Sequence, residues 1–121
     1  MDERELIERY NDAWNAHDVD AIASMHADDV VFHNWSADER AEGAQAVREH
    51  IAQIFRNNPD LAFRGRRLYV HPGLVVSEWT ATASRDGVTR EWDGVDVFPI
   101  EDGKIKRKDV YSGAGVAREV R

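Results

Sequence analysis

The chain contains no cysteine. A disulfide, a thiolate nucleophile and a cysteine-ligated zinc are therefore excluded from its chemistry. It also lacks the run of about 18 apolar residues that a membrane-spanning helix needs, and its acidic first residues are unlike a secretory signal. We therefore expect a cytoplasmic protein that has no membrane partner.

Short motifs that mark common catalytic sites are missing as well. There is no glycine-rich phosphate loop and no Gly-x-Ser-x-Gly turn for a nucleophilic serine. The histidines show no metal-ligand spacing on one helix or strand face. We therefore predict neither a metal site nor a cofactor.

The balance of charge is acidic. A formal net charge of −7 argues against nucleic acid as the main partner, because binding phosphates requires a basic surface. Two basic clusters, residues 64–67 and 104–108, lie in strand-like segments, and we interpret them as side chains at solvent-facing alternate positions. The basic residues are mostly arginine, which, with abundant alanine, aspartate and valine, indicates a high-GC bacterial source.

Length and hydrophobic spacing predict one domain, residues 1–121, with helices first. Apolar side chains recur at three- and four-residue steps over residues 6–17, which is typical of an amphipathic helix. Asp18 is a suitable N-cap for a second helix over residues 19–26, and a third helix is expected over residues 44–57.

The rest of the chain predicts strands. One strand is expected over residues 30–35, followed by a loop or short strand over 36–43. Four more are separated by turns with glycine at the tip and form an antiparallel meander, with a loose tail over 114–121. These four strands span residues 62–71, 74–84, 88–100 and 104–112.

Two stretches, one near each end of the chain, give it a resemblance to a known family. The first contains the motifs Tyr10-x-x-x-Trp14-Asn15-x-His17-Asp18 and Ala27-Asp28-Asp29-Val30, and the second contains Asp96-x-Phe98 and Asp102-Gly103-Lys104-Ile105. With these motifs the chain resembles the nuclear transport factor two-like superfamily, in its SnoaL-like branch, over nearly its whole length. That superfamily includes ketosteroid isomerases, polyketide cyclases, limonene epoxide hydrolase and proteins without known activity.

The resemblance implies a fold and partners. The expected fold is an α+β cone, in which a curved antiparallel sheet wraps around the helices in the order α-α-β-β-α-β-β-β-β. A pocket at the open end would take a small hydrophobic molecule. Members of the family also suggest a homodimer through the outer face of the sheet.

Asp96 is the leading candidate for a catalytic residue. It shares one strand face with Trp92, Gly94 and Phe98, and a carboxylate on an apolar face is expected to have a raised pKa. In ketosteroid isomerases the matching position is a protonated aspartic acid that works beside a helix tyrosine, and Tyr10 falls at that tyrosine. The alternative is that Asp96 pairs with a buried arginine, tryptophan or tyrosine and only orders the pocket.

Asn34 and Asp109 complete the catalytic candidates. The isomerase base is an aspartate at the position of Asn34, and an amide cannot accept a proton, so classical steroid isomerisation is not expected. Limonene epoxide hydrolase is similar at Asn34 and Asp109. Its tyrosine, however, falls on Phe32, and its arginine and second aspartate fall on Trp79 and Ala81.

Aromatic residues are the expected ligand-binding walls. Helix stripe and strand parity favour Trp14, Trp79 and Trp92 in the pocket, whereas Trp35 has the opposite parity and suits an interface. The full set of predicted ligand-binding residues is Trp14, Phe32, Trp79, Trp92, Phe98 and Tyr111.

Two functional hypotheses remain open at this point. The first is a cofactor-free isomerase, cyclase or hydrolase that acts by acid-base chemistry on a small hydrophobic carbonyl, polyketide-like or epoxide substrate. The second is a non-catalytic module of the same fold that binds a hydrophobic ligand or dimerises. The missing base favours binding, while the polar groups expected in the pocket favour the enzyme, which is the function we predict from the sequence.

Overall fold

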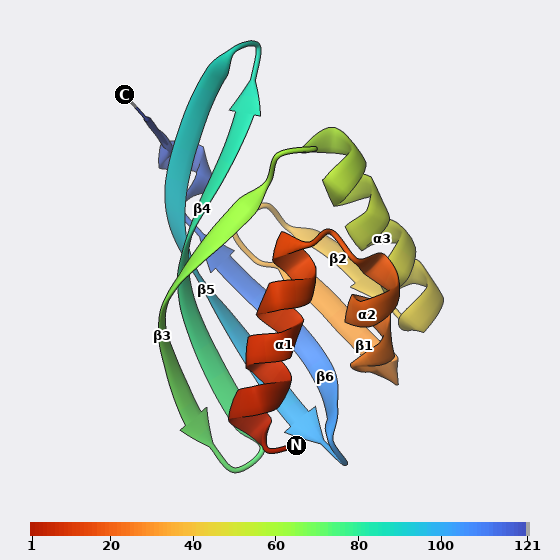
Figure 1. Cartoon of the computed structure of the whole chain (residues 1–121). Coiled ribbons are helices and arrows are strands. Elements are labelled where there is room, and N and C mark those ends of the chain that lie inside the picture. Colours follow the sequence, from red (N-terminus) through yellow and green to blue (C-terminus); the bar gives the residue numbers. More distant parts are fainter. Residues whose placement is uncertain (121) are drawn as a thin grey trace.

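The computed structural model describes residues 1–120, which form helices and one continuous sheet (Figure 1). The helices are α1 (Glu3–Asn15), α2 (Val19–Ser24) and α3 (Ala44–Asn57), with the short 3-10 turn η1 (Ala114–Val116) near the end. The strands are β1 (His26–Asn34), β2 (Glu39–Glu42), β3 (Ala62–His71), β4 (Leu74–Arg85), β5 (Val88–Glu101), β6 (Lys104–Ser112) and β7 (Arg118–Glu119). None of the helices described is long and apolar enough to cross a membrane.

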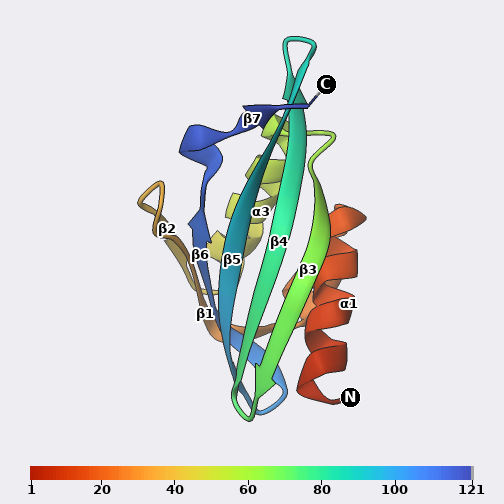
Figure 2. The ribbon, with the colours of Figure 1, turned by 90° about the vertical axis from the view of Figure 1, so that its left-hand side faces the viewer.

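The sheet forms one layer and the helices form the other. Its strands run in the order β2-β1-β6-β5-β4-β3, and the sheet curves around α1, α2 and α3 (Figure 1). Turned by 90°, Figure 2 shows β3 to β6 side by side with the helices behind them. The predicted α+β cone and its element order are confirmed. The sheet differs from the predicted antiparallel one where β1 pairs with β6, because these two strands run in parallel.

The start of the chain follows the predicted helix stripe. In α1 the buried side chains are Leu6, Ile7, Tyr10, Ala13 and Trp14. The second helix begins as predicted, because the Asp18 carboxylate accepts from the backbone N–H of Ala21.

The end of the second helix differs from the prediction. Helix α2 stops at Ser24, and His26 is already the first residue of β1, where it is buried with 7% exposure. A buried histidine needs a hydrogen-bond partner, and His26 finds it in Tyr10 of α1. The strand therefore starts four residues before the β-branched run that predicted it.

The strand turns have the predicted chemistry. Gly73, Gly87 and Gly103 have φ values of 79°, 76° and 73°, the left-handed conformation that glycine adopts without steric strain. Asp86 and Asp102, which precede two of them, also have positive φ. Paired positive φ values suit the right-handed twist of two-residue hairpins, so Asp-Gly closes the β4–β5 and β5–β6 turns.

The prediction of a loose tail is wrong for residues 114–120. Strand β7 pairs with β5, with Glu119 opposite Arg90, and Arg118 forms ion pairs with Glu91 and Asp93. Backbone pairing and charge complementarity therefore fix the end of the described chain against the sheet; Arg121 lies outside the described residues.

Candidate ligand-binding site

A buried ion pair lies between the sheet and α1. Lys108 Nζ donates to Asp96 Oδ2 over 2.9 Å, and the two residues are only 6% and 3% exposed. Removing two charges from water costs several kcal/mol for each, and their attraction offsets this cost only while they stay together. The ion pair therefore constrains the register of β5 against β6, because both residues must face inward at the same level.

Sheet register explains why both residues face inward. Asp96 lies opposite Val110, so parity places Asp96 on the inner face, as the sequence predicted. From Val97 to Ile100, β5 advances three residues while its partners on β6 advance four, from Ile105 to Asp109. This irregularity in β6 reverses the alternation, so Ile105 and Lys108 both point inward. The interpretation of Lys108 as a solvent-facing charge is therefore wrong.

Four aromatic rings surround the Lys108 ammonium. Its Nζ lies 4.6 Å from the ring centre of Trp14, and 5.0, 5.3 and 5.9 Å from those of Phe98, Tyr10 and Phe32. The negative faces of such rings attract a cation, most strongly where water is excluded. These four rings form an aromatic cage, which stabilises a charge that the sequence alone would not place in an apolar core.

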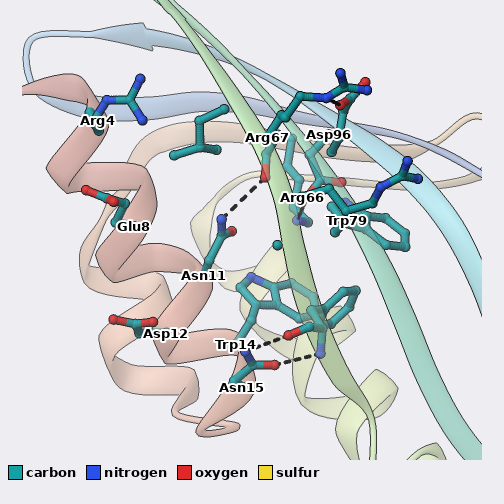
Figure 3. A pocket seen from close by; sticks show the side chains of 16 residues that line it. Arg4, Glu8, Asn11, Asp12, Trp14, Asn15, Arg66, Arg67, Trp79 and Asp96 are labelled. Carbon is teal, nitrogen blue, oxygen red and sulfur yellow. Dashed lines mark hydrogen bonds and ion pairs between the residues drawn. The ribbon is translucent and has the colours of Figure 1, made fainter.

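A cavity of ≈ 400 Å³ opens from this pair towards the gap between α1 and β3 (Figure 3). Asp96, Lys108 and Ser77 form its inner end, and Trp14 and Trp79 contribute aromatic walls. Charged side chains from α1 and from the β3–β4 pair surround the mouth. These are Arg4, Glu8, Asp12, Arg66, Arg67 and Glu78.

Side-chain amides of α1 set the width of the gap. Asn15 donates to the carbonyl oxygen of Phe63 and accepts from its backbone N–H, at 2.9 and 2.7 Å, as a neighbouring strand would. One turn earlier, the Asn11 amide donates to Ser77 Oγ at 3.3 Å (Figure 3). The start of strand β3 is thus hydrogen-bonded to α1, and the cavity lies past these hydrogen bonds along the strand.

Glycines shape two walls of the cavity. Trp79 lies across Gly94 so closely that a Cβ added to Gly94 would come within 2.2 Å of the indole ring. Gly65 lies opposite Trp79 on the other side, and a Cβ added there meets nothing within 4 Å. Gly94 therefore gives Trp79 its position, whereas the space beside Gly65 is open.

Three buried polar atoms at the cavity walls have no hydrogen-bond partner. They are Asp96 Oδ1, Trp14 Nε1 and Trp79 Nε1, and all three residues line the cavity. Most buried polar atoms in proteins are paired, and an unpaired one costs about 1–3 kcal/mol. The residues that line the cavity therefore hold one unpaired acceptor and two unpaired donors.

Tyr10 does not pair with Asp96 as predicted. Its hydroxyl is hydrogen-bonded to His26 Nε2 at 2.8 Å, and the residue is fully buried in the core. Burial raises the pKa of the Tyr10 phenol far above its ordinary value. Burial, with the nearby Lys108 charge, lowers the pKa of His26 to about 4. A neutral phenol and a neutral imidazole therefore share this bond behind the aromatic cage.

The prediction that Asp109 and Tyr111 share the pocket with Asp96 is wrong. Asp109 lies opposite Val97, so both residues face the outer side of the sheet, where Asp109 accepts from Arg107 and from Trp35 Nε1. Burial alone would raise the pKa of Asp109, but these hydrogen bonds outweigh it and keep the pKa below its ordinary value. Tyr111 is 49% exposed.

Asn34 serves the backbone and does not line the cavity. Its Oδ1 accepts from the backbone N–H groups of Ser36 and Ala37, at 3.1 and 3.3 Å, which closes the turn after β1. A short amide beside a chain reversal commonly makes this turn. The predicted polar group of Tyr10, Asn34, Asp96 and Asp109 therefore does not converge, and only Asp96 reaches the cavity.

The predicted aromatic walls are only partly found. Trp14 and Trp79 line the cavity, while Phe32 and Phe98 are core residues around Lys108 and Trp92 packs at the edge of the core. Trp35 is on the outer face as predicted, 48% exposed and stacked on Tyr111. The homodimer stays a prediction, which sedimentation velocity of the purified chain would check.

Sequence reasoning missed Lys108, Asn11 and Ser77. Asn11 is one turn before Asn15 on the cavity side of α1, and Ser77 has the inward parity of Trp79. The spacing of Asn11 and Ser77 in the sequence could have predicted their place at the cavity. The irregularity in β6 that turns Lys108 inward leaves no such pattern in the sequence. Among residues 1–120 no group of three or more acidic or histidine side chains could hold a metal ion.

A family model described as a SnoaL-like domain matches residues 7–108. The chain belongs to this family. A search of proteins with curated function finds no match for this SnoaL-like domain.

Solved structures show the same fold at low identity. An uncharacterised cystatin-fold protein from Novosphingobium aromaticivorans is 24% identical, with a TM-score of 0.81 over 91% of this chain and 97% of its own. The epoxide hydrolase/cyclase-like enzyme SalBIII, from pyran ring formation in the polyether salinomycin, is 21% identical, with a TM-score of 0.85 over 97% and 95%. A putative ketosteroid isomerase from Kribbella flavida is 20% identical, with a TM-score of 0.77 over 90% and 76%.

Removing one partner of the ion pair should destabilise the domain. We expect Asp96→Leu or Lys108→Met alone to lower the free energy of unfolding by about 3–5 kcal/mol, because each leaves a buried charge unpaired. The double variant should recover most of the loss, since two apolar side chains replace the pair. Urea unfolding of the four proteins measures this coupling, and additive losses would contradict it.

The stability of the domain should also fall in mild acid because of His26. Its pKa is about 4 in the folded protein and 6.5 ordinarily, so unfolding takes up a proton between these pH values. The contribution is fully present above the ordinary pKa, and on the order of 3 kcal/mol is lost as pH falls through the window. Urea unfolding at several pH values measures the slope, and His26→Gln should flatten it; an equal slope in the variant would refute the assignment.

Proposed function

We propose that this SnoaL-like domain binds a small, flat, uncharged molecule that carries both a hydrogen-bond donor and an acceptor. The observation that carries the proposal is that three residues lining the cavity hold buried polar atoms without a partner, namely Asp96 Oδ1 and the indole N–H groups of Trp14 and Trp79. A hydroxyl of the ligand would donate to Asp96, and its carbonyl or ether oxygen would accept from Trp14 or Trp79.

The size and walls of the cavity support this class of ligand. Its volume of ≈ 400 Å³ falls in the range of small-molecule sites, which are mostly apolar with a few placed polar groups. Trp14, Trp79 and Phe63 offer flat apolar contact, which favours an aromatic or cyclic skeleton. The charged mouth would discriminate little between such molecules, because Arg67 and Glu78 are already paired.

Selectivity between ligands should come from the hydrogen-bond donor that the ligand presents to Asp96. A ligand without a hydroxyl or N–H leaves the buried Asp96 oxygen unpaired, and this costs about 1–3 kcal/mol relative to a ligand that pairs it. Ligands that carry a carboxylate should be rejected, since a second negative charge would face Asp96 where water is excluded. The cavity is thus expected to select neutral phenols and hydroxyketones over acids.

Binding can be tested with para-hydroxybenzyl alcohol and para-hydroxyacetophenone, followed by tryptophan fluorescence. We expect Trp79→Phe to weaken binding about fivefold to tenfold, the value of one lost hydrogen bond, and Gly65→Leu to abolish it by filling the open space. Trp35→Phe is the matched control and should leave the affinity unchanged, since Trp35 is on the outer face. Equal affinity in Gly65→Leu would place binding elsewhere and refute the proposal.

A second candidate function is proton-transfer catalysis in the same cavity. The observation in its favour is that Asp96 keeps one oxygen free while Lys108 donates to the other. General acid-base catalysis needs a positioned base and a positioned donor, and this pair supplies one of each. Because Lys108 already occupies one of the two Asp96 oxygens, binding is the leading proposal. Isomerase, cyclase or hydrolase chemistry on a small hydrophobic carbonyl or epoxide substrate would fit such a pair.

Catalysis has its own test. In D2O, the protein should speed the loss of methyl protons from para-hydroxyacetophenone, as Asp96 removes a proton next to the carbonyl, and NMR follows this loss. The benzyl alcohol should inhibit the exchange, and Gly65→Leu should prevent it. Binding without any acceleration over buffer would leave the domain a binding module.

A further inference from the structure

Lysine is scarce in this chain and confined to one strand. It occurs only at positions 104, 106 and 108, whereas the other basic residues are arginines. Lys104 donates to the carbonyl oxygen of Ser24, and Lys106 pairs with Asp29, both near the surface. Lys108 is therefore the one lysine amine that lines the cavity.

The surroundings of Lys108 differ from those of a lysine kept only as a charge. Its single hydrogen bond goes to Asp96, and its other sides face aromatic rings and the cavity. An arginine in its place would hold its proton permanently, whereas a lysine can lose a proton and become a nucleophile. Asp96 Oδ2, at 2.9 Å, is placed to accept that proton.

We propose that Lys108 captures aldehydes and ketones that enter the cavity, forming an imine with the carbonyl carbon. The inference rests on the proposed function, because the carbonyl compound must first bind in the same cavity. It adds a covalent site and a substrate class, namely small flat carbonyl compounds that bind in the reverse orientation, with the carbonyl carbon towards Nζ and any hydroxyl away from Asp96.

The reaction balances with the groups at hand. Asp96 takes one proton from the Lys108 ammonium, and the freed nitrogen lone pair forms a bond to the carbonyl carbon while the C=O π bond breaks. The oxygen gains the proton held by Asp96, and a second proton passes from nitrogen to that oxygen through Asp96. The C–O bond then breaks and water leaves as the C=N bond forms. An ammonium and a carbonyl thus give a protonated imine and water, with no oxidant or reductant.

The site suits the product as well as the reactant. The protonated imine carries the same positive charge as the ammonium, so the attraction to Asp96 and to the rings of Trp14 and Phe98 persists. A neutral product would leave the Asp96 carboxylate buried without a counter-charge, which is costly. Carbonyl capture is therefore a reaction that this buried pair tolerates.

Reductive trapping tests the proposal on the intact protein. The protein is incubated with para-hydroxybenzaldehyde and cyanoborohydride, which reduces the imine to a stable amine, and peptide mapping locates the added group. We expect labelling of Lys108 about tenfold faster than of Lys104 or Lys106, because binding holds the carbonyl beside Nζ.

Two variants sharpen the result. Lys104→Arg with Lys106→Arg leaves Lys108 as the only lysine and should keep its labelling rate, while the terminal amine is resolved by the map. Gly65→Leu places a side chain in open space beside the cavity and should reduce Lys108 labelling about tenfold by excluding the bound aldehyde. Labelling of Lys104 and Lys106 should not change in Gly65→Leu, which separates access from general reactivity.

The outcomes separate the two proposals. If para-hydroxybenzyl alcohol binds but the aldehyde labels only Lys104, Lys106 or the terminus, carbonyl capture is overturned and ligand binding stands. If neither compound binds and Lys108 stays unlabelled, both proposals fail. If Lys108 is labelled equally fast in Gly65→Leu, the carbonyl does not arrive through the cavity, and the inference is overturned as well.

Discussion

The Asp96–Lys108 ion pair is the constraint on which the rest of the structure depends. Each charge is tolerable in the core only beside the other, so β5 and β6 must present them at one level of the inner face. The aromatic rings of α1, β1 and β5 then gather around the ammonium. The cavity is the space left where this charged centre meets the gap between α1 and β3. The ion pair thus sets where the site lies within the fold.

Local sequence patterns predicted most of the fold, because they report local physics. The stripe of α1, the Asp18 cap and the Asp-Gly turns depend on neighbours in the chain, and each of them is found in the structure. The prediction of the boundary between α2 and β1 was wrong because a contact between residues distant in the sequence, Tyr10 and His26, holds the start of the strand. The prediction of a loose tail was wrong for the same reason, since the pairing of β7 with β5 leaves no periodic pattern in the sequence.

The candidate site was less predictable. Strand parity placed Asp96 and Trp79 correctly, and the helix stripe placed Trp14. Extending parity through β6 hid Lys108, because one irregular step reverses every side chain beyond it. The resemblance to characterised enzymes assigned Asn34 and Asp109 to the pocket, whereas here the first closes a turn and the second faces outward. A fold shared at about one-fifth identity therefore shows the frame alone and does not by itself assign the polar groups inside it.

The contact between Trp79 and Gly94 has a consequence for how this domain could diversify. The indole occupies the room that a side chain at position 94 would need, so its position depends on the absence of a single methyl group. An alanine there would push the ring towards the cavity and shrink it, and the unpaired Trp79 Nε1 would move with the ring. A descendant of this protein could thus exchange one ligand for a smaller one in a single mutational step, keeping its charged centre but losing the stability that moving a rigid ring in a packed core costs.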